Sequence, residues 1–509
     1  MKRNVWPEWA LLSVSLLFVF ALRMGRQPDV ELNPDTSAWI SGAISAARSD
    51  APIWTLLTHS DSRPLTVLPL FLLEWLGLPV DWYVADLTGL VLWLFTAVAC
   101  YRILRRWMSP RRAGLGTLPL LLFLAGTTEP DYIAYNSEHV GVLMLTLGFG
   151  WVLTLETAPP RLGRSLLLGV WLGCLPFAKF QTVPMGVCLG LGAAFFLYRR
   201  GQFRPLVGLF IGSVLPTVLV LAYYAYRETA TSFWNDYFWN YYYYSFTTVY
   251  SNVPVGNRFS LNYVGRLFFQ HTYTRFFWLS GALLLSLGMY AYATSRRQGR
   301  EATPAVHGLC LLLLLSSVYA AVQAGNLYDH YTLFVVVPLL LAAALFAQSL
   351  PPLPFRLSYC LVIGLLLLES TLNGFTYSLA PRFQPTLTDR LIRQRVAAVV
   401  QPGQTMTIWG YADRFFVWSR RAAGNRLSHT FWAYWPSPLR PYRQTELLHD
   451  LTTHQTPWFL DFSQSRAMLD STIDRPDRFP VLAMYLHRHY TLVDSVERVR
   501  FYKRRMREE

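Results

Sequence analysis

The sequence predicts a multi-pass α-helical membrane protein with a small α/β domain at its C-terminal end. Of its 509 residues, 53% are hydrophobic, and apolar runs that could cross a bilayer recur through the first three-quarters of the chain. The formal net charge is +15, with the arginines gathered mostly in short loops between the apolar runs. That distribution follows the positive-inside rule, so the charge does not indicate a nucleic-acid partner.

The first apolar run, residues 6–22, follows the basic segment Met1-Lys2-Arg3 and at first resembles a signal peptide. No small-residue cleavage site follows it, and many further apolar runs do. We therefore expect an uncleaved first helix that delivers the loop 23–63 to the outer face of the membrane.

Asn33-Pro34-Asp35 stands in this first outer loop, immediately before an amphipathic run at residues 36–48. A short acidic side chain at a helix start commonly caps the free backbone N–H groups, so Asp35 is a candidate helix cap. Because the position lies at the membrane boundary, Asp35 is also a candidate catalytic base. This stretch alone leaves both interpretations open.

The next part of the chain holds three apolar stretches, 64–78, 82–104 and 115–126, with an arginine cluster at 105–112. If the polar segment 129–138 faces outward like the first loop, the number of crossings before it must be even. The stretch 115–126 is too short to span comfortably. We therefore expect it to be the incomplete crossing, which would place the arginine cluster outside, against the positive-inside rule.

From residue 140 onward, apolar runs and basic loops alternate, so that each basic loop falls inside. The expected crossings are 140–155, 165–178, 185–198, 206–226, 276–293, 306–324, 331–347 and 357–372. Together with the earlier stretches they make roughly 11–12 hydrophobic segments. The long outer loop between the fourth and fifth of these crossings contains an aromatic run at 233–250. That run fits a membrane-interface belt or a sugar-stacking surface, and both remain open.

The chain divides into a membrane domain at 1–375 and a C-terminal extracytoplasmic domain at 376–509. In the second part, helix-like and strand-like segments alternate, which is typical of an α/β domain. Helices are expected at 388–400, 445–453 and 482–490, and strands at 405–409, 458–462, 491–493 and 499–502.

Several ionisable and polar residues are expected near the outer boundary of the membrane, where burying them is costly unless they serve a function. Each has an ordinary explanation alone, such as a helix cap, a snorkelling lysine or a carboxylate that complements a helix dipole. A shared face of carboxylates and cations instead suggests a general base with a phosphate clamp. The residues are Asp35, Asp61, Arg63, Asp131, Glu138, Lys179, Gln181, Asp329 and His330.

Seven short motifs, in this order along the chain, carry a resemblance to a known family. They are Asn33-Pro34-Asp35, Ser60-Asp61-Ser62-Arg63-Pro64-Leu65, Tyr135-Asn136-Ser137-Glu138, Phe177-Ala178-Lys179-Phe180-Gln181 with Pro184, His330-Tyr331, Ile408-Trp409-Gly410 and Trp458-Phe459-Leu460-Asp461. In these motifs and their topological placement, nearly the whole chain resembles the GT-C superfamily of membrane glycosyltransferases. It is most similar to the bacterial family 39-like group, which resembles the dolichyl-phosphate-mannose-protein mannosyltransferases.

The resemblance implies an enzyme of the bacterial inner membrane that transfers a hexose or pentose, with inversion, from a polyprenyl-phosphate donor on the extracytoplasmic face. The implied acceptor is a glycan, a lipid or a protein, and the other partners are membrane lipids, with no nucleic acid. Asp35 takes the role of the base, and Arg63 and Lys179 are expected to bind the donor phosphate. The other expected substrate-binding residues are Asp61, Glu138, Gln181, His330 and Tyr331.

The chain departs from the family at Thr36, where relatives commonly have a glutamate directly after the aspartate. Glu31 or Asp61 could supply the missing carboxylate, and a divalent metal stays an open alternative. Two other functional classes remain as alternatives. One is a transporter or flippase for a lipid or polysaccharide, although the sequence shows no inverted repeat. The other is an inactive scaffold with the same fold.

Overall fold

The protein is described from a computed structural model, which covers residues 6–48, 55–157, 161–227, 229–270, 274–298, 304–373, 384–467 and 476–505. The chain forms two compact units. The helical unit comprises Met1–Gln27, Gly89–Trp234 and Tyr241–Ser378, and the sheet unit comprises Pro28–Thr88, Asn235–Asn240 and Leu379–Glu509. The domain boundary expected at residue 375 lies outside the described residues, so it stays a prediction.

Seven helical segments among the described residues are long and apolar enough to cross a membrane. They are α5 (Trp82–Arg105), α11 (Val183–Arg199) with η1 (Phe180–Thr182), α12 (Phe203–Tyr226), α16 (Arg275–Arg297), α17 (Pro304–Val322), α18 (Leu333–Ala347) with η5 (Asp329–Thr332), and α19 (Pro352–Leu372). Four further helices of the helical unit are α1 (Trp6–Met24), α6 (Pro110–Gly126), α8 (Ser137–Thr154) and α9 (Leu162–Gly173). The multi-pass helical membrane architecture is therefore confirmed.

Short elements connect these helices. They are α7 (Pro130–Ile133), α10 (Leu175–Ala178), α13 (Ala230–Phe233), the π-helix η2 (Trp234–Trp239), α14 (Asn240–Phe246), η3 (Val255–Phe259) and α15 (Leu261–Phe269). The aromatic run at 233–250 thus forms helical turns. Tyr241 donates a 2.8 Å hydrogen bond to Gln323 Oε1, and its ring centroid lies 4.0 Å from that of Phe180, with the two rings tilted by 31°.

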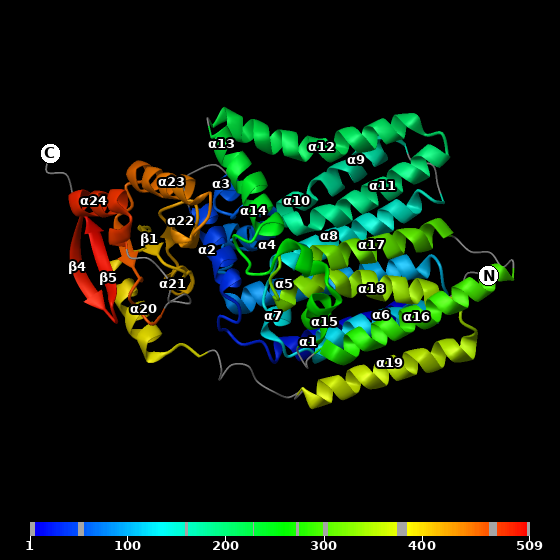
Figure 1. The fold of residues 1–509 in the computed structure, drawn as a ribbon. Helices are drawn as coiled ribbons and strands as arrows, with labels where there is room; N and C mark the ends of the chain where they lie inside the picture. The colour runs from blue at the N-terminus through cyan, green and yellow to red at the C-terminus, as the bar shows by residue number, and fades with distance from the viewer. Residues whose placement is uncertain are drawn as a thin grey trace. The chain divides into compact units, whose positions relative to one another are not determined.

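The helix α6 corrects the expected crossing pattern. It runs alongside α18 and α19 (Figure 1), and a Cβ added at Gly116 would lie 3.2 Å from that of Ala344. Arg112, in the first turn of α6, donates a 2.8 Å hydrogen bond to the carbonyl of Gln348, in the turn between α18 and α19. The arginine cluster at 105–112 therefore lies at the same end of the helices as that turn, where the positive-inside rule places it.

The prediction that the stretch 115–126 is the incomplete crossing was wrong. The helix begins earlier, at Pro110, and its 17 residues extend about 25 Å at 1.5 Å per residue. The incomplete segment is α4 (Pro64–Trp75), whose 12 residues extend only about 18 Å and which belongs to the sheet unit.

The helices α9 and α12 pack closely because both carry glycines four residues apart. A Cβ added at Gly169 would lie 2.2 Å from the carbonyl oxygen of Leu209, and one at Gly212 would lie 2.2 Å from that of Leu166. One turn away, a Cβ added at Gly173 would lie 2.2 Å from the carbonyl oxygen of Ser213, and one at Gly208 would lie 2.7 Å from the Leu162 side chain. This is the small-residue packing that lets the backbones of membrane helices come into contact, here between parallel helices whose N-terminal ends lie together.

The sheet unit is built on a five-stranded sheet in the order β2-β1-β3-β5-β4. Its strands are β1 (Thr405–Trp409), β2 (Ala422–Ala423), β3 (Trp458–Asp461), β4 (Tyr490–Val496) and β5 (Val499–Arg504). The strands β2, β1 and β3 are parallel, whereas β5 and β4 complete the sheet antiparallel. Ile408, Leu460 and Phe501 from the three central strands are fully buried in its core.

Helices pack on this sheet at α20 (Leu387–Val399), α21 (Arg414–Ser419), α22 (Phe431–Tyr434), α23 (Arg440–Thr453), η7 (Pro476–Arg478) and α24 (Pro480–His489). The small C-terminal α/β architecture is confirmed, and every helix and strand expected there is present within a few residues. The sequence did not predict β2, α21 or α22, which are six residues or shorter.

The sheet unit also contains residues far away in the sequence, in α2 (Pro34–Arg48), α3 (Thr55–Thr58) and α4. The helix α2 packs against α4, α21 and β2. Ser45 Oγ accepts a 2.9 Å hydrogen bond from the backbone N–H of Ala423, and Arg420 forms an ion pair with Glu74. The first predicted outer loop and the C-terminal segment therefore fold together as one unit.

Candidate functional site

The start of α2 is capped by Asn33, not by Asp35. The backbone N–H of Asp35 donates a 2.8 Å hydrogen bond to Asn33 Oδ1, and the N–H of Thr36 donates to the Asn33 carbonyl at 3.1 Å. An asparagine side chain satisfies the first free N–H groups of a helix in this way. The interpretation of Asp35 as the cap was wrong, and its carboxylate is available for another contact.

That contact comes from Tyr411, whose hydroxyl donates a 2.7 Å hydrogen bond to Asp35 Oδ1. Tyr411 follows the central strand β1 directly after Gly410, whose φ of 146° is a conformation that side chains disfavour. Burial and the neighbouring Asp35 hold the pKa of Tyr411 well above its usual range. The phenol therefore stays protonated and holds the half-buried carboxylate in place.

A buried aspartate and histidine lie next to Tyr411. Asp413 is 2% exposed, and neither of its carboxylate oxygens accepts a hydrogen bond from the described residues. His429 Nδ1 lies 3.6 Å from Asp413 Oδ2, and the His429 ring centroid lies 5.2 Å from that of Tyr411. Burial alone would lower the pKa of His429, but Asp413, Asp61 and Asp35 together raise it above its ordinary value.

Glu31, considered as a substitute for the missing glutamate, has other partners. Ser37 Oγ donates a 2.5 Å hydrogen bond to Glu31 Oε1 and in turn accepts one of 2.9 Å from Trp82 Nε1. Arg414 Nη1 lies 3.5 Å from Glu31 Oε2. Burial raises the pKa of Glu31, an effect that Arg414 partly opposes. These contacts fix the segment that leads into α2, directly before Asp35.

Asp61 and Arg63 lie in the tight turn before α4. Arg63 Nη1 is 3.9 Å from Asp61 Oδ2, and its guanidinium stands 5.0 Å from the centre of the Trp39 ring on α2. Asp61 and Ser62 have φ values of 45° and 61°, which are uncommon for residues other than glycine. Such strain costs about 1–3 kcal/mol per residue and is frequent at functional sites.

In the helical unit, Glu138 and Lys179 form a buried ion pair. Glu138 lies in the first turn of α8, where a carboxylate complements the helix dipole, and Asn136 caps that helix. The Lys179 ammonium contacts Glu138 Oε1, and the two residues are only 6% and 0% exposed. Lys179 Nζ also stands 4.8 Å from the centre of the Tyr331 ring, a cation–π contact.

His330 joins the same part of the helical unit through Asp131. Its Nδ1 lies 3.0 Å from Asp131 Oδ2. The hydroxyl of Tyr331 is hydrogen-bonded to that of Tyr244, which follows the aromatic turn η2. Gln181 donates a 3.4 Å hydrogen bond to the carbonyl of Ala320, so this contact is a structural one.

The predicted site residues thus form two clusters, one in each unit. Asp35, Asp61 and Arg63 lie in the sheet unit, and the other five lie in the helical unit. The five cysteines are free thiols. In the described parts of both units, no three His, Cys, Asp or Glu side chains are close enough together to hold a metal ion.

Sequence reasoning missed Tyr411, Asp413 and His429. A usable signal was present, because Gly410 to Asp413 follow directly on a strand of the predicted α/β domain. Functional residues of such folds gather at the carboxyl ends of parallel strands. The contact with Asp35 could not be inferred, since 376 residues separate the two partners.

No protein-family model matches the chain, and no curated protein matches it in sequence. Solved structures do match in fold. ArnT from Cupriavidus metallidurans bound to undecaprenyl phosphate matches with a TM-score of 0.59 and 14% identity, over 98% of each chain. The apo state of ArnT matches with a TM-score of 0.56 and 14% identity, again over 98% of each chain.

The archaeal oligosaccharyltransferase AglB from Archaeoglobus fulgidus, in complex with an inhibitory peptide and a dolichol-phosphate, is also similar. Its TM-score is 0.51 at 8% identity, over 91% of this chain and 70% of AglB. The closer resemblance to the family 39-like group stays a prediction. The match over almost the full length of ArnT shows that this chain has the fold of the GT-C membrane glycosyltransferases.

Proposed function

We propose that the protein is a membrane glycosyltransferase that moves a hexose or pentose from a polyprenyl-phosphate donor to an acceptor on the extracytoplasmic face. The observation that carries the proposal is the carboxylate of Asp35, released from helix capping and held by Tyr411, in a chain with the GT-C fold. The structures of ArnT with undecaprenyl phosphate and AglB with dolichol-phosphate support a lipid-phosphate carrier.

Asp35 acts as the general base in this proposal. Its carboxylate takes the proton from an acceptor hydroxyl or amine, whose oxygen or nitrogen attacks C1 of the donor sugar. The bond between C1 and the phosphate oxygen breaks, the electron pair leaves with the polyprenyl phosphate, and the configuration at C1 inverts. Tyr411 is a positioning residue, because it holds Asp35 Oδ1 while leaving Oδ2 for the acceptor.

Lys179 and Arg63 are proposed to stabilise the phosphate of the donor or of the leaving lipid. Lys179 is already neutralised by Glu138, so Glu138 sets its position and a phosphate would share the ammonium. The guanidinium of Arg63 is 26% exposed and lies 3.9 Å from Asp61, and a planar guanidinium can donate two parallel N–H groups to one phosphate. Asp61, His330 and Tyr331 would orient the sugar or the acceptor.

The proposal is tested by incubating the purified full-length protein with a panel of polyprenyl-phosphate sugars and candidate acceptors. We expect at least one donor to release free polyprenyl phosphate in an acceptor-dependent reaction. Parallel reactions with Mg²⁺ and with a chelator determine whether a divalent metal is needed. Transmembrane movement of an intact lipid-linked sugar in vesicles, without loss of the sugar, would instead identify a flippase. Absence of both activities would support an inactive scaffold.

A further inference from the structure

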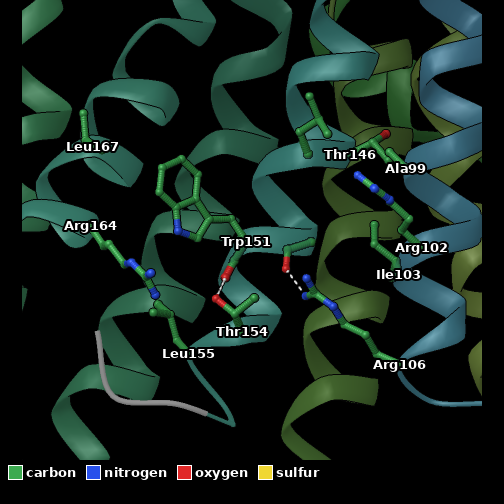
Figure 2. A pocket seen from close by; sticks show the side chains of 12 residues that line it. Ala99, Arg102, Ile103, Arg106, Thr146, Trp151, Thr154, Leu155, Arg164 and Leu167 are labelled. Carbon is green, nitrogen blue, oxygen red and sulfur yellow. Dashed lines mark hydrogen bonds between the residues drawn. The ribbon is translucent and has the colours of Figure 1, made fainter. Parts of the chain in front are cut away.

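A cavity of about 580 Å³ lies at one end of the helical unit, between α5, α8 and α9. Figure 2 shows three arginines around it: Arg102 and Arg106 from the end of α5 and the residues after it, and Arg164 from the first turn of α9. Its volume falls in the range of about 300–1,000 Å³ that is usual for small-molecule sites. The residues discussed under the proposed function do not line this cavity.

The cavity lies near one membrane boundary, at the far end of α8 from the Glu138–Lys179 pair. Glu138 is the second residue of α8, and Thr154, which lines the cavity, is its last. The 16 residue steps between them span about 24 Å along the helix, close to the thickness of a bilayer core of about 30 Å. The arginines are therefore at the level where lipid headgroups stand.

The charge in the cavity is of one sign. None of its described lining residues is acidic, and Glu156, which follows α8, is not among them. Arg102 and Arg106 are one helical turn apart, a spacing at which like charges repel each other. Arg106 Nη1 donates a 2.7 Å hydrogen bond to the carbonyl of Gly150, which fixes this guanidinium on the wall (Figure 2). Its other N–H groups can still donate, and an anion would relieve the repulsion.

The remainder of the lining is apolar. Leu147 and Leu167 line the cavity and are 42% and 56% exposed. Ile103 and the indole of Trp151 also line it. A site with guanidinium groups beside exposed leucines suits a ligand that carries a phosphate and a hydrocarbon chain, and a free phosphate would use only part of it.

We propose that this cavity binds an anionic glycerophospholipid, with its phosphate on Arg102, Arg106 and Arg164 and an acyl chain between Leu147 and Leu167. Other arginines at this end have different roles: Arg112 donates to the carbonyls of Gln348 and Leu350. The site is separate from the proposed donor site and does not depend on the proposed function.

The test measures lipids retained by the purified full-length protein, reconstituted with a mixture of phosphatidylcholine and phosphatidylglycerol, by native mass spectrometry. The variant is Arg102→Gln/Arg164→Gln. Its control is Arg199→Gln/Arg204→Gln, which removes the same charge from exposed arginines at the end of α11 and the start of α12. Because α9 and α12 start at the same end, this control samples the same leaflet.

We expect retention of phosphatidylglycerol to fall about tenfold or more in the cavity variant and to stay at the wild-type level in the control. If the cavity variant and the control retain the same amount of phosphatidylglycerol, whether at the wild-type level or below it, the proposed site is wrong. Glycerol 3-phosphate is added as a competitor without acyl chains, and we expect it to leave the lipid in place. Displacement of phosphatidylglycerol by an equal concentration of glycerol 3-phosphate would overturn the assignment to a lipid.

Discussion

At the scale of single residues, the proposed base is defined by two neighbours that act on different atoms. Asn33 accepts the backbone N–H of Asp35, while Tyr411 donates to its carboxylate. Asn33 therefore caps the helix, and the Asp35 side chain is not needed as a cap in addition to its proposed role as the base. Asp35 is itself in the first turn of α2, so the helix holds its backbone in place.

Replacing Tyr411 by phenylalanine removes only the hydroxyl that holds Asp35. A hydrogen bond to a charged group contributes about 1.5–3 kcal/mol, so we expect kcat to fall roughly tenfold to a hundredfold.

Tyr485→Phe is the matched control for Tyr411→Phe. This substitution also removes one hydroxyl from the sheet unit. The Tyr485 hydroxyl donates a 2.9 Å hydrogen bond to the carbonyl of Leu451 and not to Asp35. We expect an unchanged kcat in this variant. If Tyr411→Phe behaves like the control at equal protein level, Tyr411 does not position the base.

His429 predicts a pH-dependent stability. Its pKa is raised in the folded protein, where the carboxylates of Asp413, Asp61 and Asp35 outweigh the effect of burial. The stabilisation is fully present below the unfolded-state pKa of about 6.5 and is lost as the pH rises through the higher folded-state pKa. We expect the thermal midpoint of the wild type to fall across this window, and that of His429→Gln to fall less.

His487→Gln, at an exposed position on α24, is the control. A midpoint that falls equally in all three proteins would contradict the prediction.

At the scale of elements, the glycines of α9 and α12 decide how these helices pack. Replacing Gly169 by alanine would put its Cβ 2.2 Å from a backbone oxygen, so the helices must separate. We expect a loss of about 1–3 kcal/mol in stability, measured as a lower thermal midpoint. Gly190→Ala on α11 adds a methyl group into open space and should be neutral or slightly stabilising. Equal midpoints for both variants would show that the close packing of α9 and α12 is not needed.

The sequence predicts most elements because long apolar runs and alternating strand patterns are local signals. It fails at α6, because the first turn of that helix contains Arg111 and Arg112 and so did not count as apolar. At α4 the error is the reverse: an apolar stretch was counted as a crossing, but this short helix packs against α2. In both places the number of apolar residues was a poor measure of helix length, and the parity of the early crossings was consequently wrong.

At the scale of the whole molecule, the chain pairs a bundle of membrane helices with a unit made from distant segments. Residues 28–88 and the C-terminal segment share one unit. The order of the motifs along the chain predicted the fold class, because that order can be read from the sequence without knowing any tertiary contact. The sheet-unit site could not be predicted in full, because Tyr411 and His429 reach Asp35 and Asp61 only through tertiary structure.

The membrane topology yields a prediction for substituted cysteines in a background without the five native ones. Ser109 and Ser349 lie in the α5–α6 and α18–α19 turns, and Asn257 lies in η3. We expect Ser109→Cys and Ser349→Cys to react with an impermeant maleimide only after the membrane is permeabilised, and Asn257→Cys to react in intact cells. Labelling of Ser109→Cys and Ser349→Cys from opposite sides would contradict the course of α6.

The most direct measurement is the release of polyprenyl phosphate by wild-type protein and by Asp35→Asn, at equal amounts of purified protein and with the donor that the wild type accepts. The substitution keeps the size of the side chain and removes the base. We expect a decrease of about 10²- to 10⁴-fold in acceptor-dependent release, with an unchanged thermal midpoint. Release at the wild-type rate by Asp35→Asn would contradict the assignment of Asp35 as the base.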